Sequence, residues 1–250
     1  MSLYTGGVPY VPCQSCPLRA SGPFKDYADR DISFLDTLKK DHVAVPAGRD
    51  IVDAGDPDPP LFTLFSGWAF RYKLLDDGRR QILNFLLPGD PIGFQGHMFE
   101  ASPHSVQTLT DVELCSFHRG KIWELFKSHP ELAFDLTWLT AREECHVDDN
   151  LLSVGRRSAV EAVGALLIHL YKRAEALNLH RNGGVEFPLT QAHIADALGL
   201  SLVHTNKSLR KLSKMGMHEI KNGALTLNNG RALEKLTQIF EEPLKPRPLL

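Results

Sequence analysis

Residues 189–212 hold the pattern that most restricts what this chain can fold into. Thr190 precedes a short segment of helical apolar periodicity, Gly199 follows that segment, and Ser201 precedes a second one. Thr and Ser are good helix N-caps because their side-chain oxygens accept backbone N–H groups. Glycine tolerates the positive φ of a tight turn. The pattern therefore predicts two short helices joined by a tight turn, which is a helix-turn-helix.

The spacing of apolar residues assigns an inner face to each helix. The residues expected to be buried are Ile194, Ala195 and Leu198 in the first helix and Thr205, Ser208, Leu209 and Leu212 in the second. The residues expected to face outward from the second helix are Leu202, Val203, His204, Asn206, Lys207, Arg210 and Lys211. Such a face suits DNA, since residues near the N-terminus of a recognition helix reach base edges and basic residues reach phosphates.

A hairpin signal follows the two helices. Asn222-Gly223 lies between two short strand-like segments, 217–221 and 224–227, and Asn-Gly is the strongest short signal for a β-hairpin. A helix-turn-helix followed by a hairpin is a winged helix. A packing corner of two helices with no role in DNA binding is the alternative.

Charge is distributed unequally along the 250 residues. Residues 151–250 contain 14 Lys and Arg and 8 Asp and Glu, a net charge of +6. The totals of 28 and 30 leave 14 and 22 for residues 1–150, a net charge of −8. A basic C-terminal half is expected if that half alone contacts a polyanion, although ordinary surface charge is the alternative.

Short strands are predicted between residues 43 and 118. Turn signals recur there every 8–12 residues or so, which is typical of an antiparallel sandwich or barrel. The turn signals are Ala47-Gly48, Gly55-Asp56, Ser66-Gly67, Asp77-Gly78, Pro88-Gly89-Asp90 and Ile92-Gly93. The expected strands are 51–52, 61–65, 68–74, 81–86, 105–109 and 112–117.

Helices are predicted at 121–129, at 131–153 and, after an N-cap at Ser158, at 159–176. The second of these carries two stripes at helical spacing. One stripe is Leu132, Leu136, Leu139, Glu143, His146 and Asn150, and the other is Phe134, Trp138, Ala141, Cys145 and Leu152. One face can pack on the sandwich, and the other needs a partner such as the same helix of a second subunit. Burial of both faces within one chain is the alternative.

The first 24 residues form an irregular arm rich in Pro and Gly, which includes Cys13-Gln14-Ser15-Cys16. Four cysteines in 250 residues do not indicate a disulfide scaffold. No secretory signal and no apolar run near the roughly 20 residues of a membrane span are visible, so a cytoplasmic protein is expected. The expected divisions are the arm 1–24, a β-rich domain 25–130, a long helix 131–154 and a C-terminal domain 155–250.

The chain resembles the Crp/Fnr family of bacterial transcription regulators over residues 13–235, closer to the Fnr/FixK branch than to the cyclic-AMP-binding members. The resemblance rests on Val203-His204-Thr205-Asn206-Lys207 and on the turns named above, among them Leu87-Pro88-Gly89-Asp90. It implies an α+β fold with an N-terminal double-stranded β-helix, the cyclic-nucleotide-binding-like β-roll, a dimerisation helix and a winged helix-turn-helix. It also implies a non-enzymatic homodimer that binds palindromic double-stranded DNA, contacts RNA polymerase if it is an activator, and has no membrane partner.

The resemblance and side-chain chemistry together select the residues expected to contact DNA. Asn206 and Lys207 are the first candidates for base contacts, because Asn suits adenine and Lys suits guanine in the major groove. Val203 and His204 come next. The candidates for phosphate contacts are Arg210, Lys211, Thr190 and Gln191.

The signal that such a regulator would sense is a separate question. In cyclic-AMP-binding members a Glu after the Ile-Gly turn holds the ribose and an Arg holds the phosphate. Phe94 and His104 occupy those two positions here. Because a buried phosphate without Arg loses its bidentate partner, the sequence argues against cyclic AMP.

The Fnr branch implies instead an oxygen-sensing iron–sulfur cluster on four cysteines. Cys13, Cys16 and Cys115 match three of those positions, but Gly22 occupies the fourth. Four interpretations stay open. The first is an iron–sulfur cluster that has an unusual fourth ligand or bridges two subunits, and the second is a zinc site. The third is a thiol redox switch of Cys13 and Cys16, and the fourth is that the cysteines are structural, with Cys115 and Cys145 buried as small apolar residues.

A function of another class is a cupin-like metalloprotein or enzyme that uses the β-roll, with the C-terminal helices only structural. No histidine-rich metal motif is visible in the sequence, and this reading leaves the helix-turn-helix unexplained.

Overall fold

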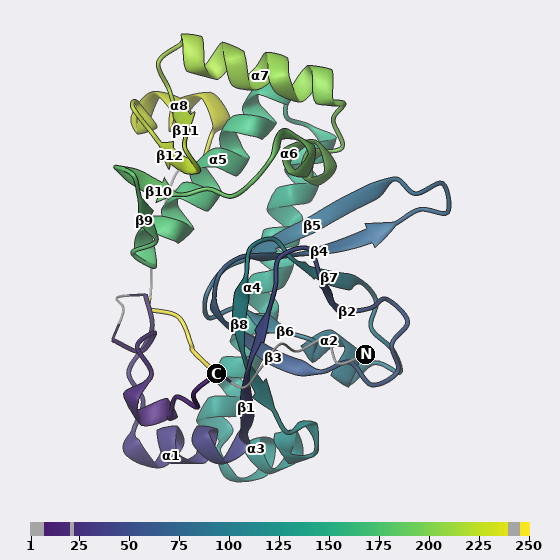
Figure 1. Cartoon of the computed structure of the whole chain (residues 1–250), viewed down its shortest axis with the longest axis vertical. Helices are drawn as coiled ribbons and strands as arrows, with labels where there is room; N and C mark the ends of the chain where they lie inside the picture. Colours follow the sequence, from purple (N-terminus) through teal and green to yellow (C-terminus); the bar gives the residue numbers. More distant parts are fainter. Residues whose placement is uncertain (1–7, 21–22, 240–245) are drawn as a thin grey trace. The chain divides into compact units, whose positions relative to one another are not determined.

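The computed structural model describes residues 8–20, 23–239 and 246–250. The chain divides into two compact units, each of which is taken here by itself (Figure 1). The first unit comprises residues up to 73, residues 85–144 and the segment from 245 to 250. The second comprises residues 74–84 and 145–244.

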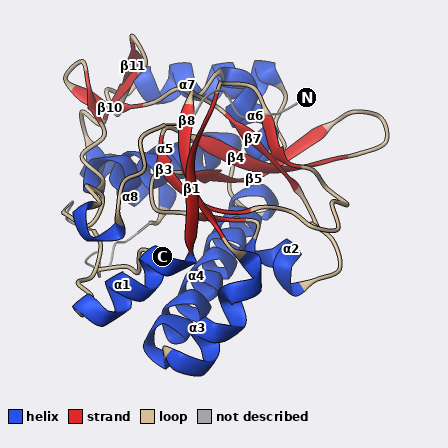
Figure 2. Ribbon diagram, turned by 60° about the horizontal axis from the view of Figure 1, so that its bottom comes forward, coloured by secondary structure: helices blue, strands red, loops and turns tan. Residues whose placement is uncertain are grey.

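Two four-stranded sheets form the β-roll (Figure 2). The order is β1-β8-β3-β6 in one sheet and β2-β7-β4-β5 in the other. Neighbours β1 and β8, β3 and β8, and β4 and β7 pair antiparallel, as expected from the turn spacing. The strands are β1 Lys39–Val45, β2 Asp50–Val52, β3 Leu61–Ser66, β4 Ala69–Leu74, β5 Arg80–Leu86, β6 Pro91–Ile92, β7 Ser105–Thr108 and β8 Val112–Phe117.

An apolar core fills the space between the sheets. Its buried members come from all eight strands and include Val45, Ile51, Phe62, Leu64, Ala69, Leu86, Ile92, Val106 and Leu114. Six strands lie where the sequence predicts them, and the predicted fold class is confirmed. The structure adds β1, the short strand β6, and helix α2, Phe94–Met98, at the turn expected around Ile92-Gly93.

Helices close one end of the β-roll. Helix α1, Asp29–Leu38, was not among the expected elements, whereas α3, Ile122–Ser128, and α4, Pro130–Gly155, lie close to their predicted positions. They share a second apolar cluster, to which the arm contributes Cys13. The cluster contains Cys13, Leu35, Leu38, Leu125, Leu132 and Ala133, with Leu250 packed against it.

Helix α4 buries one of its two apolar stripes. Leu132, Leu136 and Leu139 are buried, together with Glu143. On the other stripe Phe134 is 69% exposed, and Cys145 and Leu152 are exposed as well. The alternative in which one chain buries both faces of this helix is therefore wrong, and Cys145 is not the buried apolar residue that one interpretation required.

The second unit is built around α5, Ala159–Ala176. Its N-terminus is a capping box, because the Ser158 hydroxyl accepts the Glu161 N–H and the Glu161 carboxylate accepts the Ser158 N–H. Buried residues lie on most sides of the helix, among them Val163 and Leu167. The other elements are β9 His180–Arg181, β10 Gly184–Glu186, α6 Gln191–Leu198, α7 Leu202–Lys214, β11 Glu219–Lys221, β12 Ala224–Thr226 and α8 Gly230–Thr237.

None of the helices in the described part of the chain has the length and apolar character that a membrane span requires.

Candidate nucleic-acid interface

Helix α6 begins with a reciprocal cap. The Thr190 hydroxyl accepts the His193 N–H at 3.3 Å, and the His193 ring nitrogen Nδ1 accepts the Thr190 N–H at 3.2 Å. Both bonds satisfy donors that a helix N-terminus leaves without partners. Ile194, Ala195 and Leu198 are buried, so the inner face predicted for this helix is confirmed.

A tight turn joins α6 to α7. Gly199 has a φ of +63°, the left-handed conformation that favours glycine, and the Leu200 N–H donates to the Ala195 carbonyl at 3.0 Å. The Ser201 hydroxyl then accepts the His204 N–H at 3.3 Å and caps α7. The cap, glycine and second cap therefore act as the sequence predicts.

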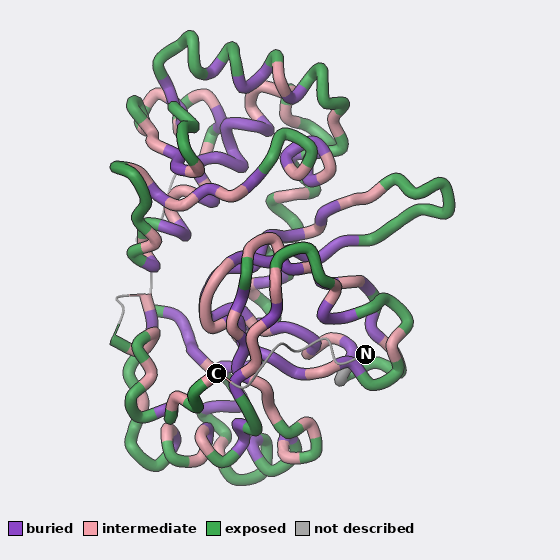
Figure 3. The backbone as a smooth tube through the Cα atoms, in the orientation of Figure 1, coloured by how far each residue is buried: buried purple, intermediate pink, exposed green. Residues whose placement is uncertain are grey.

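Helix α7 separates a buried face from an exposed one, and the two alternate along its trace in Figure 3. Its buried residues are Thr205, Ser208, Leu209 and Leu212, as predicted. Near its N-terminus Val203 is 62% exposed and His204 is exposed. Lys207, Arg210 and Lys211 follow on the exposed face.

Asn206 and Gln191 lie together, although the sequence assigned them different roles. The Asn206 Nδ2 donates to the Gln191 Oε1 at 3.0 Å, and Asn206 is half-buried. Because an amide nitrogen carries two hydrogens and the amide oxygen two lone pairs, this bond leaves Asn206 one N–H to donate and its whole amide oxygen to accept. The bond holds the side chain at the edge of the exposed face.

Basic side chains line a concave surface along the C-terminal half of α7. The lining residues are Lys207, Arg210, Lys211, Lys214 and Met215. Sequence reasoning missed Lys214. Its spacing of three residues from Lys211 and four from Arg210 was the available signal, since such residues share one helix face.

The hairpin after α7 has the predicted turn. Asn222 and Gly223 have φ values of +52° and +73°, which are the two positive values of a type I′ turn. Strands β11 and β12 pair on either side of it and belong to a sheet with β10 and β9. Lys221 is exposed next to the turn.

A hairpin from earlier in the chain also supports α6 within the second unit. The Arg80 guanidinium contacts the Asp196 carboxylate, with Nη2 at 2.8 Å from Oδ2. The Gln81 Nε2 donates to the Ala197 carbonyl at 3.0 Å. These contacts join residues 116 positions apart and left no signal in the local sequence pattern.

Comparison with known proteins identifies both parts of the chain. A cyclic nucleotide-binding domain matches residues 42–129, and a Crp-like helix-turn-helix domain matches residues 161–236. The nitrogen fixation regulation protein FixK of Rhizobium meliloti is 33% identical over 174 residues, which are 68% of this chain and 74% of that protein. The chain belongs to the Crp/Fnr family.

Two further relatives place this Crp/Fnr regulator in the Fnr/FixK branch. FixK of Bradyrhizobium diazoefficiens is 28% identical over 224 residues, 90% of this chain and 93% of that protein. The structure of FixK2 from Bradyrhizobium japonicum has a TM-score of 0.72 and 26% identity, and covers 80% of this chain and 97% of that one. The chain is therefore a DNA-binding transcription regulator and not an enzyme, and the cupin-like alternative is wrong.

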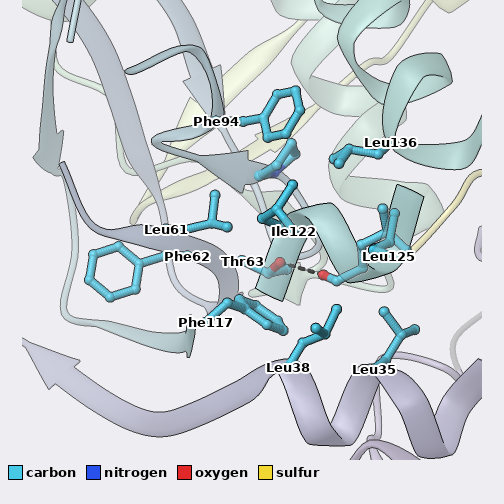
Figure 4. A pocket seen from close by; sticks show the side chains of 12 residues that line it. Leu35, Leu38, Leu61, Phe62, Thr63, Phe94, Phe117, Ile122, Leu125 and Leu136 are labelled. Atoms are coloured by element: carbon cyan, nitrogen blue, oxygen red, sulfur yellow. Dashed lines mark hydrogen bonds between the residues drawn. The ribbon is translucent and has the colours of Figure 1, made fainter. Parts of the chain in front are cut away.

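Phe94 and His104 are the two residues whose identity argues, from the sequence, against cyclic AMP. Phe94 lines an apolar cavity of about 40 Å³ between α1, β3 and α3 (Figure 4). His104 is buried, and burial, with Arg71 and Lys73 nearby, lowers the pKa of its ring to about 4, so the ring is neutral at pH 7. Arg71 forms a buried ion pair with Glu143 of α4.

Three cysteines lie in the first unit: Cys13 and Cys16 in the N-terminal arm, and Cys115 in β8. The Cys13 N–H donates to Asp36 Oδ1 at 2.7 Å. The Cys115 Sγ lies 3.0 Å from Nε2 of His42 on the neighbouring strand β1. Burial raises the pKa of Cys13 to about 12, and burial, with Cys16 nearby, raises the pKa of Cys115 to about 11.

The iron–sulfur and zinc interpretations of these cysteines stay predictions. Across residues 8–20, 23–239 and 246–250, no three His, Cys, Asp or Glu side chains converge as a metal site would require. Gly22, at the fourth expected ligand position, lies outside the described residues.

Proposed function

We propose that this regulator binds a palindromic operator as a homodimer, with α7 in the major groove of each half-site. The observation that supports this most strongly is the exposed face of α7, which is apolar and polar near the N-terminus and basic toward the C-terminus. That order matches the division of labour in a recognition helix, where the N-terminal residues read bases and cationic residues contact the backbone.

Individual residues receive distinct roles. Val203 suits a thymine methyl group, and His204, Asn206 and Lys207 suit polar base edges. The phosphate contacts are assigned to Thr190, Gln191, Arg210 and Lys211, to which the concave basic surface adds Lys214. Thr190 and Gln191 lie at the N-terminus of α6, where backbone N–H groups favour an anion.

The second copy is inferred from the exposed stripe of α4. Phe134 is 69% exposed, and Cys145 and Leu152 on the same stripe are exposed too. A run of large apolar side chains along one helix favours burial against another apolar surface. The same stripe of a second copy is the partner that a two-fold operator requires.

A salt-dependence experiment tests the assignment of α7. Operators enriched from random DNA are titrated with the protein at 50–200 mM salt, with fluorescence anisotropy as the readout. Each lost phosphate contact flattens the slope of log K against log salt by about 0.9, so a combined Arg210→Ala, Lys211→Ala and Lys214→Ala variant should lose about 2–3 units. A combined Arg30→Ala, Lys40→Ala and Lys127→Ala variant removes equal charge from exposed positions of the first unit and should keep the slope. Equal slopes in the two variants would rule out α7 as the DNA-binding face.

For the signal, the arrangement of thiols favours a redox response over a metal centre. Cys16 is half-buried near the buried Cys115, with Cys13 in the same arm. Cys16→Ser should remove any difference in operator affinity between air, nitrogen and peroxide. If neither the wild type nor this variant responds, the cysteines are structural.

A regulator that acts on operator DNA is expected to work in the cytoplasm, and contact with RNA polymerase is expected if its output is activation.

A further inference from the structure

Residues 246–250 follow α8 in the chain but lie against the first unit. Arg247 forms an isolated parallel bridge with Phe24. Its N–H donates to the Pro23 carbonyl at 2.7 Å, and its carbonyl accepts the Lys25 N–H at 2.9 Å. The segment thus pairs with 23–25 in the manner of an added strand.

The Arg247 side chain enters a polar pocket and is only 6% exposed. Its guanidinium donates to Asp90 Oδ1 at 2.8 Å, to the Pro88 carbonyl at 2.7 Å and to the Gly89 carbonyl at 3.3 Å. Asp90 is 0% exposed, so its charge depends on buried partners. The Phe24 ring covers the guanidinium, 4.6 Å from its centroid.

The turn under the guanidinium is shaped for these two side chains. Gly89 has a φ of +86°. A Cβ at this position would lie 2.4 Å from the Phe24 ring and 2.9 Å from Arg247 Nη2. A glycine here is therefore required both by the backbone conformation and by the close approach of the segment.

The two leucines that end the segment meet apolar and polar partners. Leu249 is buried, and its carbonyl accepts from Arg19 Nη2 at 3.2 Å. Leu250 lines the apolar cavity between α1, β3 and α3, where its carbonyl accepts from the Thr63 hydroxyl (Figure 4). Around it lie Leu35, Leu38, Phe117 and Leu125.

We propose that this surface is a peptide-binding site whose ligand is the chain's own segment Pro246–Leu250. Three features recognise the ligand: strand addition along 23–25, a carboxylate and two carbonyls for an arginine, and an apolar groove for leucine. Pro246 and Pro248 restrict the free segment, which lowers the ordering cost of docking.

Binding in trans is the direct test. The probe is a fluorescein-labelled Lys-Pro-Arg-Pro-Leu-Leu peptide, measured by anisotropy against the intact chain and against a chain that ends at residue 244. The shortened chain should bind the peptide at least tenfold more tightly than the intact chain, because the attached segment competes at a high effective concentration. Alanine in place of the arginine of the peptide should weaken binding at least tenfold. A folded shortened chain that binds neither peptide overturns the proposal.

Two point variants separate the site from general charge effects. Arg247→Ala in the intact chain should free the site and raise the affinity for the peptide toward that of the shortened chain. Arg30→Ala is the matched control, because that side chain is 73% exposed and lies outside the site. It should leave the affinity unchanged, and equal effects of the two variants would overturn the proposal.

Amide exchange on the unmodified chain does not depend on any variant folding. The amides of Lys25 and Arg247 donate in the bridge and should exchange at least a hundredfold more slowly than in an unstructured peptide. Exchange at the unstructured rate overturns the proposal. Protection that persists on dilution supports a segment from the same chain, whereas protection lost on dilution assigns it to a second copy and overturns the proposal.

Discussion

Charged side chains are exposed to solvent on the outer face of α7 but buried in ion pairs inside the β-roll. On α7, Lys207, Arg210 and Lys211 are exposed to solvent along one face. In the β-roll, Arg71 is buried against Glu143, and Asp90 is buried against Arg247. Exposed charges of one sign are available to a polyanion, whereas buried pairs are already neutralised and leave no charge for a ligand. The charges of these two buried pairs in the β-roll are thus already balanced, whereas those on the proposed DNA-binding face are exposed to solvent.

The largest expected effect comes from breaking the buried pair. Glu143→Ala leaves the Arg71 guanidinium buried without its carboxylate, which should lower the free energy of unfolding by about 3–5 kcal/mol. Urea unfolding measures the loss. Glu144→Ala, at the exposed neighbouring position, is the control and should change stability by less than about 0.5 kcal/mol. A loss no larger than that of the control would show that the buried ion pair in the β-roll does not stabilise the fold.

On the outward face of α7, a substitution should change the affinity for operator DNA and leave the free energy of unfolding unchanged. Asn206→Ala should cost about 1–3 kcal/mol of operator affinity and relax the preference at one base pair per half-site. Anisotropy titrations against operators substituted at each position measure both effects. Uniform weakening at every position would reassign Asn206 to the backbone.

The interior histidine makes stability depend on pH. Burial and nearby cations lower the pKa of His104 to about 4, below its usual value of about 6.5 in the unfolded chain. Between these pH values the unfolded chain binds a proton that the native state does not, so stability should fall as the pH drops from about 6.5 to 4. One histidine contributes a slope of at most about 1.4 kcal/mol per pH unit. His104→Gln should reduce the slope measured by urea unfolding at pH 7 and pH 5, and an unchanged slope would contradict the assignment.

The smallest effect concerns the start of α7. Ser201→Ala removes the hydroxyl that accepts the His204 N–H and should cost about 1 kcal/mol of stability. Ser213→Ala, at an exposed position inside the same helix, should be nearly neutral. Thermal unfolding of the two variants measures the difference, and equal midpoints would show that the cap is dispensable.

Local patterns were sufficient to predict the helix-turn-helix and the wing. Thr190, Gly199 and Ser201 act on backbone groups within a few residues, and Asn222-Gly223 sets its own turn. Caps and turns of this kind can be predicted from the sequence, because the backbone groups with which they interact are only a few residues away.

Partners far apart in the chain were not predictable in this way. Arg247 and Asp90 are 157 residues apart, and Arg71 and Glu143 are 72 apart. The placement of Cys115 against His42 depends on the register of β1 with β8. No periodicity encodes such choices, since each depends on how distant elements pack.

Helix α1 was missed for a different reason. Its sequence, Asp29–Leu38, begins with three charged residues, and its start has no side-chain cap. Only the packing of Leu35 and Leu38 against α3 and α4 distinguishes it from a surface loop. Tertiary contacts determine such an element more than its own propensity does.

The buried Arg71–Glu143 pair also limits which substitutions this regulator tolerates. A change of either residue alone would leave the charge of the other buried without its counter-ion, and that single step carries the full cost of an uncompensated buried charge. The two residues are therefore expected to change together or in a background stabilised elsewhere.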